Sequence, residues 1–346
     1  MKSKGKKIEL LVRRTIESHG LLAGKLHVVV GFSGGPDSTG LLAILSEFAS
    51  DYGITPLAVY IDHGLRPSET LEEIGFVQQT AQTLGVRWET RAVGVREYAR
   101  EKKLSLEHAA RDLRYEALRA VAAKYPRSVL AVAHNADDQA EEILLRLLRG
   151  SGRQGLSGMR HKNGDVIRPL LDLRKEEILS YLTERGLSHC VDSSNVDDRF
   201  VRNRIRLELL PYLERRFDKG VRRALIKTAS ILAEDEELLE QLASDAYQRT
   251  VRLEKGEGWP TAVLKREEFG KLPGALRRRV VEKLLWHLGS RAHYEHIMKT
   301  IQAAERGTSG TELHLKQGLR VGVERDLLRF SYPEGRRAWR GRLHEK

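Results

Sequence analysis

A glycine-rich turn that follows an apolar run constrains this 346-residue chain more than any other feature. Residues 26–30 are largely apolar and β-branched and predict a buried strand, and residues 41–45 predict the helix that follows. Between them stands the sequence SGGPDS, residues 33–38. Its adjacent glycines allow backbone amides to converge, and Pro36 suits a first helical turn. The converging amides and the helix dipole predict an anion-binding turn.

The pattern of this turn excludes two common phosphate-binding loops. No lysine follows the glycines as in a Walker loop, and the turn lacks the GxGxxG spacing of dinucleotide-binding folds. It resembles instead the PP-loop, the pyrophosphate-binding loop of N-type ATP pyrophosphatases. The alternative, an ordinary strand-to-helix turn, would not need two serines and an aspartate together. The ATP-binding residues that this resemblance implies are Ser33, Gly34, Gly35, Pro36, Asp37 and Ser38.

Further strands are predicted by apolar runs that alternate with helical patterns. The runs are residues 55–61, 86–93 and 129–133. This alternation predicts an α/β fold with a doubly wound, mainly parallel sheet. Ligands of such sheets bind beyond the carboxyl ends of the strands, so polar segments that follow strands are expected to converge there. The segments are residues 33–38, 62–63 and 134–138.

The domain organisation is predicted to be bipartite. A catalytic domain is expected over residues 1–215, a linker helix with a smaller, mainly helical α+β domain over 216–332, and a basic tail over 333–346. The linker is predicted as one amphipathic helix over 221–250, and the smaller domain is expected to end in a hairpin. Two local predictions complete this description. Glycine-rich residues 150–163 are expected to form a mobile loop, and a basic helix from Arg202 is expected to stop at Pro211.

Composition narrows the class of protein. Cys190 is the single cysteine, which excludes a disulfide framework or a CxxC pair and points to the cytosol. No apolar run reaches the ~20 residues of a membrane span. Residues 1–198 carry 28 basic and 27 acidic side chains, whereas residues 199–346 carry 32 and 21. This asymmetry favours a nucleic-acid partner, with a solvated basic surface as the alternative.

Several side chains are candidates for chemistry. A carboxylate beside phosphates repels them unless a cation intervenes, so Asp37 is expected to hold Mg²⁺; its alternative role is to complement a helix dipole. Asp137, Asp138 and Glu141 fall within about one helical turn and could cage an amine or a metal. Dipole complementarity is the alternative for the two aspartates.

Arginines provide the remaining candidates. Arg111 and Arg114 stand one helical turn apart. An arginine such as Arg111 near a phosphate could stabilise charge that develops there, although a surface salt-bridge lattice fits this spacing equally well. Arg202 and Arg206 share a helical face, and later arginines lie near aromatic residues, a combination that suits RNA. Each of these two groups of arginines, considered alone, is also consistent with a solvent-exposed helix face that has no partner. The predicted RNA-binding residues are Arg202, Arg204, Arg206, Arg277 and Arg278.

Taken in order, these segments resemble the tRNA(Ile)-lysidine synthetase family. The matching segments are residues 33–38, 62–67, 107–115, 134–141, 147–152, 168–170, 192–195 and 202–206. The resemblance implies that ATP adenylates carbon 2 of the wobble cytidine of a CAU-anticodon tRNA(Ile), and that the ε-amine of free lysine then displaces AMP. It implies a lysine site at Asp137, Asp138 and Glu141, and catalytic roles for Asp37 and Arg111.

The chain departs from the family pattern at two points. Asn135 stands where a second histidine is usual, and the chain is expected to be a short form that lacks the last C-terminal domain. Two alternative functions are another PP-loop tRNA-modifying enzyme, such as a thiolase, and a noncatalytic tRNA-binding protein. Thiolases that use a cysteine pair or a cysteine-bound cluster could not work with Cys190 alone, and an amidotransferase would need a glutaminase nucleophile, for which Cys190 is poorly placed. The oligomeric state also remains open, with a homodimer as one alternative.

Overall fold

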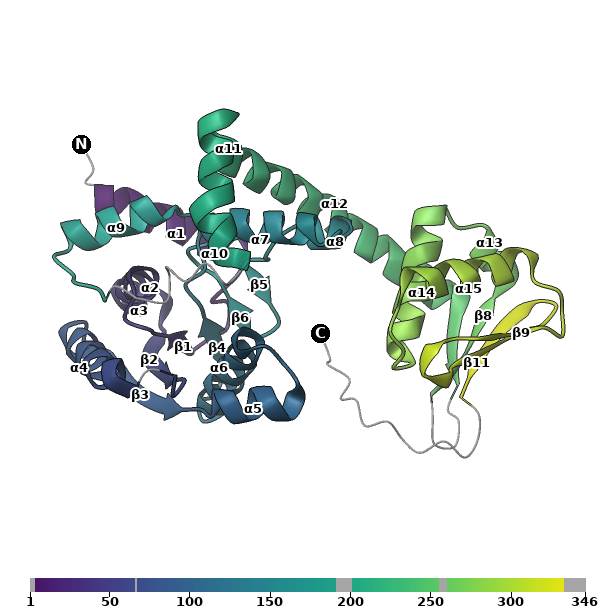
Figure 1. Ribbon diagram of the computed structural model, residues 1–346, viewed down its shortest axis with the longest axis horizontal. Helices are drawn as coiled ribbons and strands as arrows, with labels where there is room; N and C mark the ends of the chain where they lie inside the picture. The colour runs from purple at the N-terminus through teal and green to yellow at the C-terminus, as the bar shows by residue number, and fades with distance from the viewer. Residues whose placement is uncertain (1–3, 66, 191–200, 255–259, 333–346) are drawn as a thin grey trace. The chain divides into compact units, whose positions relative to one another are not determined.

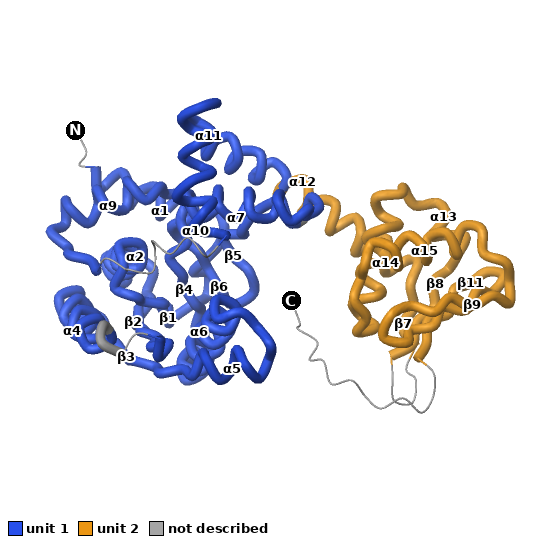
Figure 2. Tube along the Cα trace, viewed as in Figure 1, with its two compact units in different colours: residues 1–232 blue, residues 233–346 orange. Residues whose placement is uncertain are grey.

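The computed structural model describes residues 4–65, 67–190, 201–254 and 260–332 (Figure 1). The chain forms two compact units, Met1–Leu232 and Ala233–Lys346 (Figure 2). The boundary between the units lies inside helix α12, Val221–Thr250, which has the limits expected for the linker helix. The predicted functional limits at residues 215 and 332 stay predictions, and the tail 333–346 lies outside the described residues.

The first unit is built on a six-stranded sheet with the order β3-β2-β1-β4-β6-β5. Every neighbouring pair is parallel except β5–β6. The strands in this order are Arg87–Ala92, Thr55–Asp62, His27–Gly31, Ser128–Ala131, Val166–Ile167 and Lys162–Asn163. The predicted α/β fold with a mainly parallel sheet is therefore confirmed.

Helices cover both faces of this sheet. Val28 and Val30 of β1 pack into one apolar core, while Val29 packs into the core on the opposite face, because successive strand side chains alternate. The first core receives apolar side chains from four helices: α1 (Lys4–Ser18), α2 (Pro36–Glu47), α4 (Pro67–Thr83) and α9 (Lys175–Glu184). The second core receives them from α6 (Leu106–Ala122), on the other side of the sheet in Figure 1.

Helices α2 and α9 approach each other very closely. A Cβ atom on Gly40 of α2 would lie 2.7 Å from Cγ2 of Ile178 on α9, a distance that side chains do not tolerate. Glycine at position 40 therefore sets the spacing of these two helices.

The order of the strands creates a switch point beside β1. From β1 the chain continues into α2 and then β2 on one side, whereas β4 pairs with the other side of β1. Helix α7, Ala136–Leu148, follows β4. The segments after β1 and β4 thus leave adjacent parallel strands at the same edge, which is where ligands bind in sheets of this type.

Two local predictions in this unit are wrong. Residues 150–163 are not a mobile loop: they contain α8 (Arg153–Leu156) and β5, and side chains of α7 hold them in place. Arg146 donates to the carbonyl oxygens of Gly155 (2.9 Å) and Gly158 (3.0 Å). Gln139 bonds both backbone polar groups of Met159, at 2.7 and 2.9 Å. The loop is ordered because α7 supplies the hydrogen-bond partners that its backbone needs.

The basic helix does not stop at Pro211. Helix α10 (Val201–Arg204) continues through a π-helical turn, Ile205–Leu209, into α11 (Leu210–Arg216). Pro211 is the second residue of α11 and follows the π-helical turn directly, so the helical segment runs through the proline. Short helices α3 (Ala49–Tyr52) and α5 (Val95–Lys102) were not predicted.

The second unit contains a five-stranded antiparallel sheet with the order β7-β8-β11-β10-β9. The strands in this order are Val251–Glu254, Thr261–Lys265, Leu327–Ser331, Arg320–Val323 and Glu312–His314. The predicted terminal hairpin is part of this larger sheet, whose strands β7 and β8 the sequence did not reveal. The other described elements of the unit are the part of α12 from Ala233 onward, α13 (Arg266–Gly270), α14 (Gly274–His287), α15 (Tyr294–Arg306) and the 3-10 turn Lys316–Gly318. None of the described helices has the length and apolar character to cross a membrane.

Candidate active site

The turn after β1 has the backbone geometry of an anion-binding loop. Gly34 adopts a left-handed conformation, with φ 79°, and Gly35 precedes the first turn of α2 in an extended one. The Ser38 hydroxyl accepts from the Ser33 amide (3.2 Å) and donates to the Gly35 carbonyl (3.0 Å), which fixes the turn. The first amides of α2 have no intrahelical acceptor, so they are left to face a ligand.

Asp37 and Asn135 connect the two helices that begin at the switch point. Nδ2 of Asn135 donates to Oδ1 of Asp37 at 3.0 Å, which joins the start of α7 to the start of α2. Burial raises the pKa of Asp37, while Lys175, the bond from Asn135 and Arg206 act in the opposite direction. Asn135 is also the N-cap of α7: its Oδ1 accepts from the amides of Asp137 and Asp138 at 2.9 and 3.0 Å. This residue therefore orients the carboxylate predicted to face the metal.

The carboxylates of α7 and the arginines that follow them in sequence bind one another. Glu141 is 1% exposed, and its carboxylate accepts from Nε of Arg206 (2.6 Å) and Nε of Arg202 (3.1 Å). Asp138 accepts from Nη2 of Arg206 at 3.0 Å. Glu141 and Asp138, two of the predicted lysine-binding residues, thus bind arginines that were predicted to bind RNA.

Asp137 is held in a similar way. Its carboxylate accepts from Nη1 of Arg222 on α12 and from the backbone amide of Lys175, both at 2.8 Å. Burial raises the pKa of Asp138 to about 6 even though Arg202 and Arg206 favour its ionised form. The result is a network of carboxylates and guanidinium groups at the start of α7. Its members are Asp137, Asp138, Glu141, Arg202, Arg206 and Arg222, together with Glu142, which pairs with Arg202, and Glu214, which pairs with Arg222.

A second group of arginines surrounds His134. Burial lowers the pKa of His134 well below its usual value, and the charges of Arg168, Arg114, Arg202 and Arg111 add to this effect. The imidazole is therefore neutral near pH 7. Nε of Arg168 donates to Nδ1 of His134 at 3.1 Å, so the imidazole proton resides on Nε2. A concentration of positive charge without enough local carboxylates is an environment that attracts phosphate.

Arg114 and Arg168 were not assigned roles from the sequence. Burial lowers the pKa of both guanidinium groups, and Nε of Arg114 is buried without a hydrogen-bond partner in the described part of the chain. Arg111 is exposed and lies over the Tyr115 ring, 5.6 Å from its centroid. The sequence pattern pairs Arg114 with Arg111 at one helical turn, whereas the position of Arg168 depends on the tertiary fold.

Other predicted residues lie in different surroundings. Oδ1 of Asp62 accepts from the amide of Gly64 at 2.8 Å, so this strand-end carboxylate stabilises its own turn. In the second unit, Arg277 donates to the carbonyl oxygens of Leu272 (2.7 Å) and Gly270 (3.1 Å) and forms an ion pair with Glu305. Its guanidinium therefore has partners within its own unit. Residues 192–195, a segment used for the resemblance, lie outside the described residues.

Comparison with known proteins identifies the family. A model described as PP-loop domain matches residues 6–213. The tRNA(Ile)-lysidine synthase of Bacillus subtilis is 34% identical over 331 residues, which cover 93% of this chain and 69% of that protein. The chain belongs to the tRNA(Ile)-lysidine synthase family. The resemblance drawn from the sequence motifs is thereby confirmed, and membership of the PP-loop family implies the use of ATP.

The chain spans only part of the length of the relatives that it matches. The tRNA(Ile)-lysidine synthase of Geobacter sulfurreducens is 40% identical over 276 residues, which cover 79% of this chain but 58% of that protein. A solved structure, the U34-tRNA thiolase NcsA from Methanococcus maripaludis, matches 66% of this chain and 79% of its own with a TM-score of 0.55. At 18% identity that match shows a shared fold alone.

Proposed function

We propose that this protein ligates L-lysine to carbon 2 of the wobble cytidine of a CAU-anticodon tRNA(Ile). ATP first adenylates the carbon-2 oxygen and releases pyrophosphate, and the lysine ε-amine then attacks carbon 2 and releases AMP. Two relatives named tRNA(Ile)-lysidine synthase that each match 93% of the chain support the proposal. The single observation that carries it is the meeting of the glycine turn, Asp37 and the charged start of α7 at one edge of the sheet. From the single cysteine, we place the reaction in the cytoplasm.

The turn Ser33–Ser38 is proposed to bind the β- and γ-phosphates of ATP. Asp37 would hold Mg²⁺ there. Among the described residues no group of three or more His, Cys, Asp or Glu side chains could hold a metal ion. The ion would therefore be bound by Asp37 together with phosphate oxygens and water, the mixed ligand set that Mg²⁺ prefers. When bound, Mg²⁺ would neutralise charge on the leaving pyrophosphate.

The arginines around His134 are proposed to hold the α-phosphate. Arg111, as predicted, and Arg114 in addition would stabilise charge on this group when the adenylate forms and again when AMP leaves. Neutral His134 can donate from Nε2 to a phosphate oxygen, because Arg168 occupies its Nδ1. These side chains would act by positioning and electrostatics.

Lysine is proposed to bind at the carboxylate–arginine network. Its ammonium group calls for Asp137, Asp138 or Glu141, and its α-carboxylate calls for an arginine. The network offers groups of both signs, so it can pair with the two ammonium groups and the one carboxylate of lysine. Arg204 and Arg278 remain the predicted RNA-binding residues for which no intramolecular ion pair is found within the described ranges, and Arg202 and Arg206 would instead orient the carboxylates.

The decisive experiment combines the purified protein, ATP, labelled lysine and a CAU-anticodon tRNA(Ile). We expect the label to enter the RNA together with release of AMP and pyrophosphate, and we expect no incorporation when the wobble position is uridine. Binding of the tRNA without any release of AMP would instead support the noncatalytic alternative.

Lysine recognition is expected to weaken in mild acid. The carboxyl group of Asp138 has a pKa raised to about 6, so it is ionised at pH 7.5 and protonated at pH 5. Loss of its charge below pH 6 should raise the KM for lysine by up to about tenfold per pH unit, while lysine itself does not titrate there. Steady-state kinetics at saturating ATP and tRNA between pH 5 and 8 measure this profile.

The matched variant is Asp138→Asn, which keeps an acceptor for the amide of Asn135 but cannot ionise. Its KM for lysine should be high throughout and nearly independent of pH. A wild-type KM that stays constant from pH 5 to 8 would remove Asp138 from lysine recognition.

A further inference from the structure

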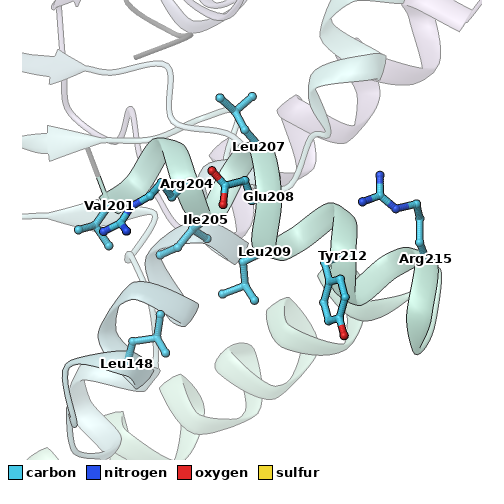
Figure 3. Close-up of a pocket in the computed structure, with 9 residues that line it drawn as sticks. All are labelled: Leu148, Val201, Arg204, Ile205, Leu207, Glu208, Leu209, Tyr212 and Arg215. Atoms are coloured by element: carbon cyan, nitrogen blue, oxygen red, sulfur yellow. The ribbon is translucent and has the colours of Figure 1, made fainter. Parts of the chain in front are cut away.

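An open pocket of about 640 Å³ lies outside the proposed active site, on the segment α10–α11 and the end of α7 (Figure 3). Its volume is in the range of small-ligand sites. The floor is apolar and includes Leu148 of α7, which is 63% exposed, and Tyr212 of α11, which is 49% exposed. The lining includes Leu148, Arg204, Ile205, Glu208, Tyr212 and Arg215.

This pocket lies on the segment that also contributes to the carboxylate–arginine network. Arg202 and Arg206 point from it to the carboxylates of α7, whereas Arg204, between them in sequence, lines the pocket. The π-helical turn Ile205–Leu209 shifts the register of the side chains, which is common at functional sites. A ligand in the pocket would therefore contact the same short segment that orients the proposed lysine site.

The charges of the pocket favour an anion. Figure 3 shows Arg204 and Arg215 at opposite ends of the lining, with Ile205 and Leu209 between them. In the part of the chain that the structure describes, neither arginine forms an ion pair with another side chain. Glu208 is the one acidic side chain in the lining. The apolar floor with a cation at each end matches a flat ring attached to phosphates.

The aromatic ring of the pocket is held in a defined orientation. Tyr212 packs against Phe217 in an edge-on arrangement, with 6.1 Å between ring centroids and an interplanar angle of 65°. In an edge-to-face pair the partner ring covers at most one face of Tyr212, and the side chain is 49% exposed, so the other face is available for stacking. Unstacked RNA bases bind proteins mainly through such faces, while arginines contact the adjoining phosphates.

We propose that this pocket binds one unstacked base of the anticodon loop, next to the nucleotide that reacts. The base would stack on Tyr212, its flanking phosphates would contact Arg204 and Arg215, and Glu208 would accept from an exocyclic amino group. The carboxylate thus favours adenine, guanine or cytosine over uracil. This inference rests on the proposed function for the identity of the RNA, and its test below does not need ligation.

The test measures binding of a CAU anticodon stem-loop RNA to the full chain without ATP or lysine. Tyr212→Ala is expected to weaken the Kd about tenfold, because loss of a stacked base has an effect of this size. Tyr212→Phe keeps the ring and should stay within about twofold of the wild type. Arg204→Ala should reduce the slope of log Kd against log salt concentration by about one, the change expected for the loss of one phosphate contact. Arg87→Ala, an exposed arginine on β3, is the control and should change neither quantity.

A spectroscopic signature locates the base. The fluorescent base 2-aminopurine is placed at each loop position in turn, and one position should change its fluorescence on binding to the wild type but not to Tyr212→Ala. An unchanged Kd for Tyr212→Ala, or no responsive position, would overturn the proposal. So would a wild-type dimer that Tyr212→Ala converts to a monomer at unchanged RNA affinity, because a second copy would then occupy the pocket.

The two hypotheses remain separable. RNA binding that depends on Tyr212 in a protein unable to ligate lysine would contradict the proposed function but leave the pocket intact. Ligation of lysine by the wild type, together with unchanged RNA affinity of the variants, would support the proposed function but contradict the proposed role of the pocket.

Discussion

Asp37→Asn is expected to lower ATP–pyrophosphate exchange about 100- to 1,000-fold, with little change in tRNA affinity. The substitution removes a charge but keeps the shape of the side chain and an acceptor for Nδ2 of Asn135. Loss of one group that stabilises developing charge has effects of this size in enzymes. Exchange of labelled pyrophosphate into ATP, in the presence of the CAU-anticodon tRNA, measures the first half-reaction alone.

The origin of this effect is the environment of Asp37. Burial raises its pKa, so the ionised form is costly unless a cation lies close. Mg²⁺ together with Lys175 would supply that cation when ATP is bound. The variant should therefore need more Mg²⁺ for half-maximal exchange, which can be measured by titration with the metal.

The control for Asp37 is Asp51→Asn. Asp51 belongs to α3, its side chain is 54% exposed, and it pairs with Arg13 at the surface. Exchange should remain within about twofold of the wild type, because exposed ion pairs contribute little. Normal exchange by Asp37→Asn would exclude the metal role and leave Asp37 as a residue that complements the dipole of α2.

Glu141→Ala is expected to have the largest effect on stability, a loss of about 3 kcal/mol in the free energy of unfolding of the first unit. Removal of one partner from a buried ion pair costs roughly 3–5 kcal/mol, because the other charge loses its compensation. The lower end applies here since Arg202 and Arg206 keep side-chain exposures of 20% and 29% and can recruit water. The midpoint of urea unfolding at unchanged slope measures the loss.

Glu176→Ala is the matched control. Glu176 is likewise a helical glutamate that faces an arginine, but it lies in the first turn of α9, its side chain is 82% exposed and its distance to Arg174 is 3.7 Å. Its removal should change the free energy of unfolding by less than about 0.5 kcal/mol. A normal midpoint for Glu141→Ala, combined with a raised KM for lysine, would mean that Glu141 serves the substrate and not the fold.

The sequence was sufficient for the elements that have long, regular patterns. The strand before the glycine turn and the helix Val221–Thr250 could be predicted because apolar residues recur over many positions. Strands β7 and β8 are short and have no such pattern, so they became apparent only from their partners in the sheet. The same applies to residues 150–163, whose order depends on side chains from another element.

The candidate site likewise contains contacts that are local in sequence, which could be predicted, and contacts between distant residues, which could not. The glycine turn and Asp37 are local in sequence, so their proximity follows from the turn itself. The pairing of Glu141 with Arg206 joins residues 65 positions apart, and the bond from Arg168 to His134 joins residues 34 apart. Residue type shows what each group can do, but only the packing of α7 against α10–α11 shows which group it meets.

The glycine at position 40 has a consequence for the width of the proposed active site. Asp37 lies on α2, and Lys175, whose amide holds Asp137 and whose charge acts on Asp37, begins α9. Ile178, one turn into α9, leaves no room for a methyl group on residue 40. The substitution Gly40→Ala would have to displace helix α9. This shift would move the amide of Lys175 away from the carboxylate of Asp137, to which it donates. The contact between Gly40 and Ile178 therefore sets the distance between α2 and α9 at the proposed active site, although neither residue needs to touch a substrate.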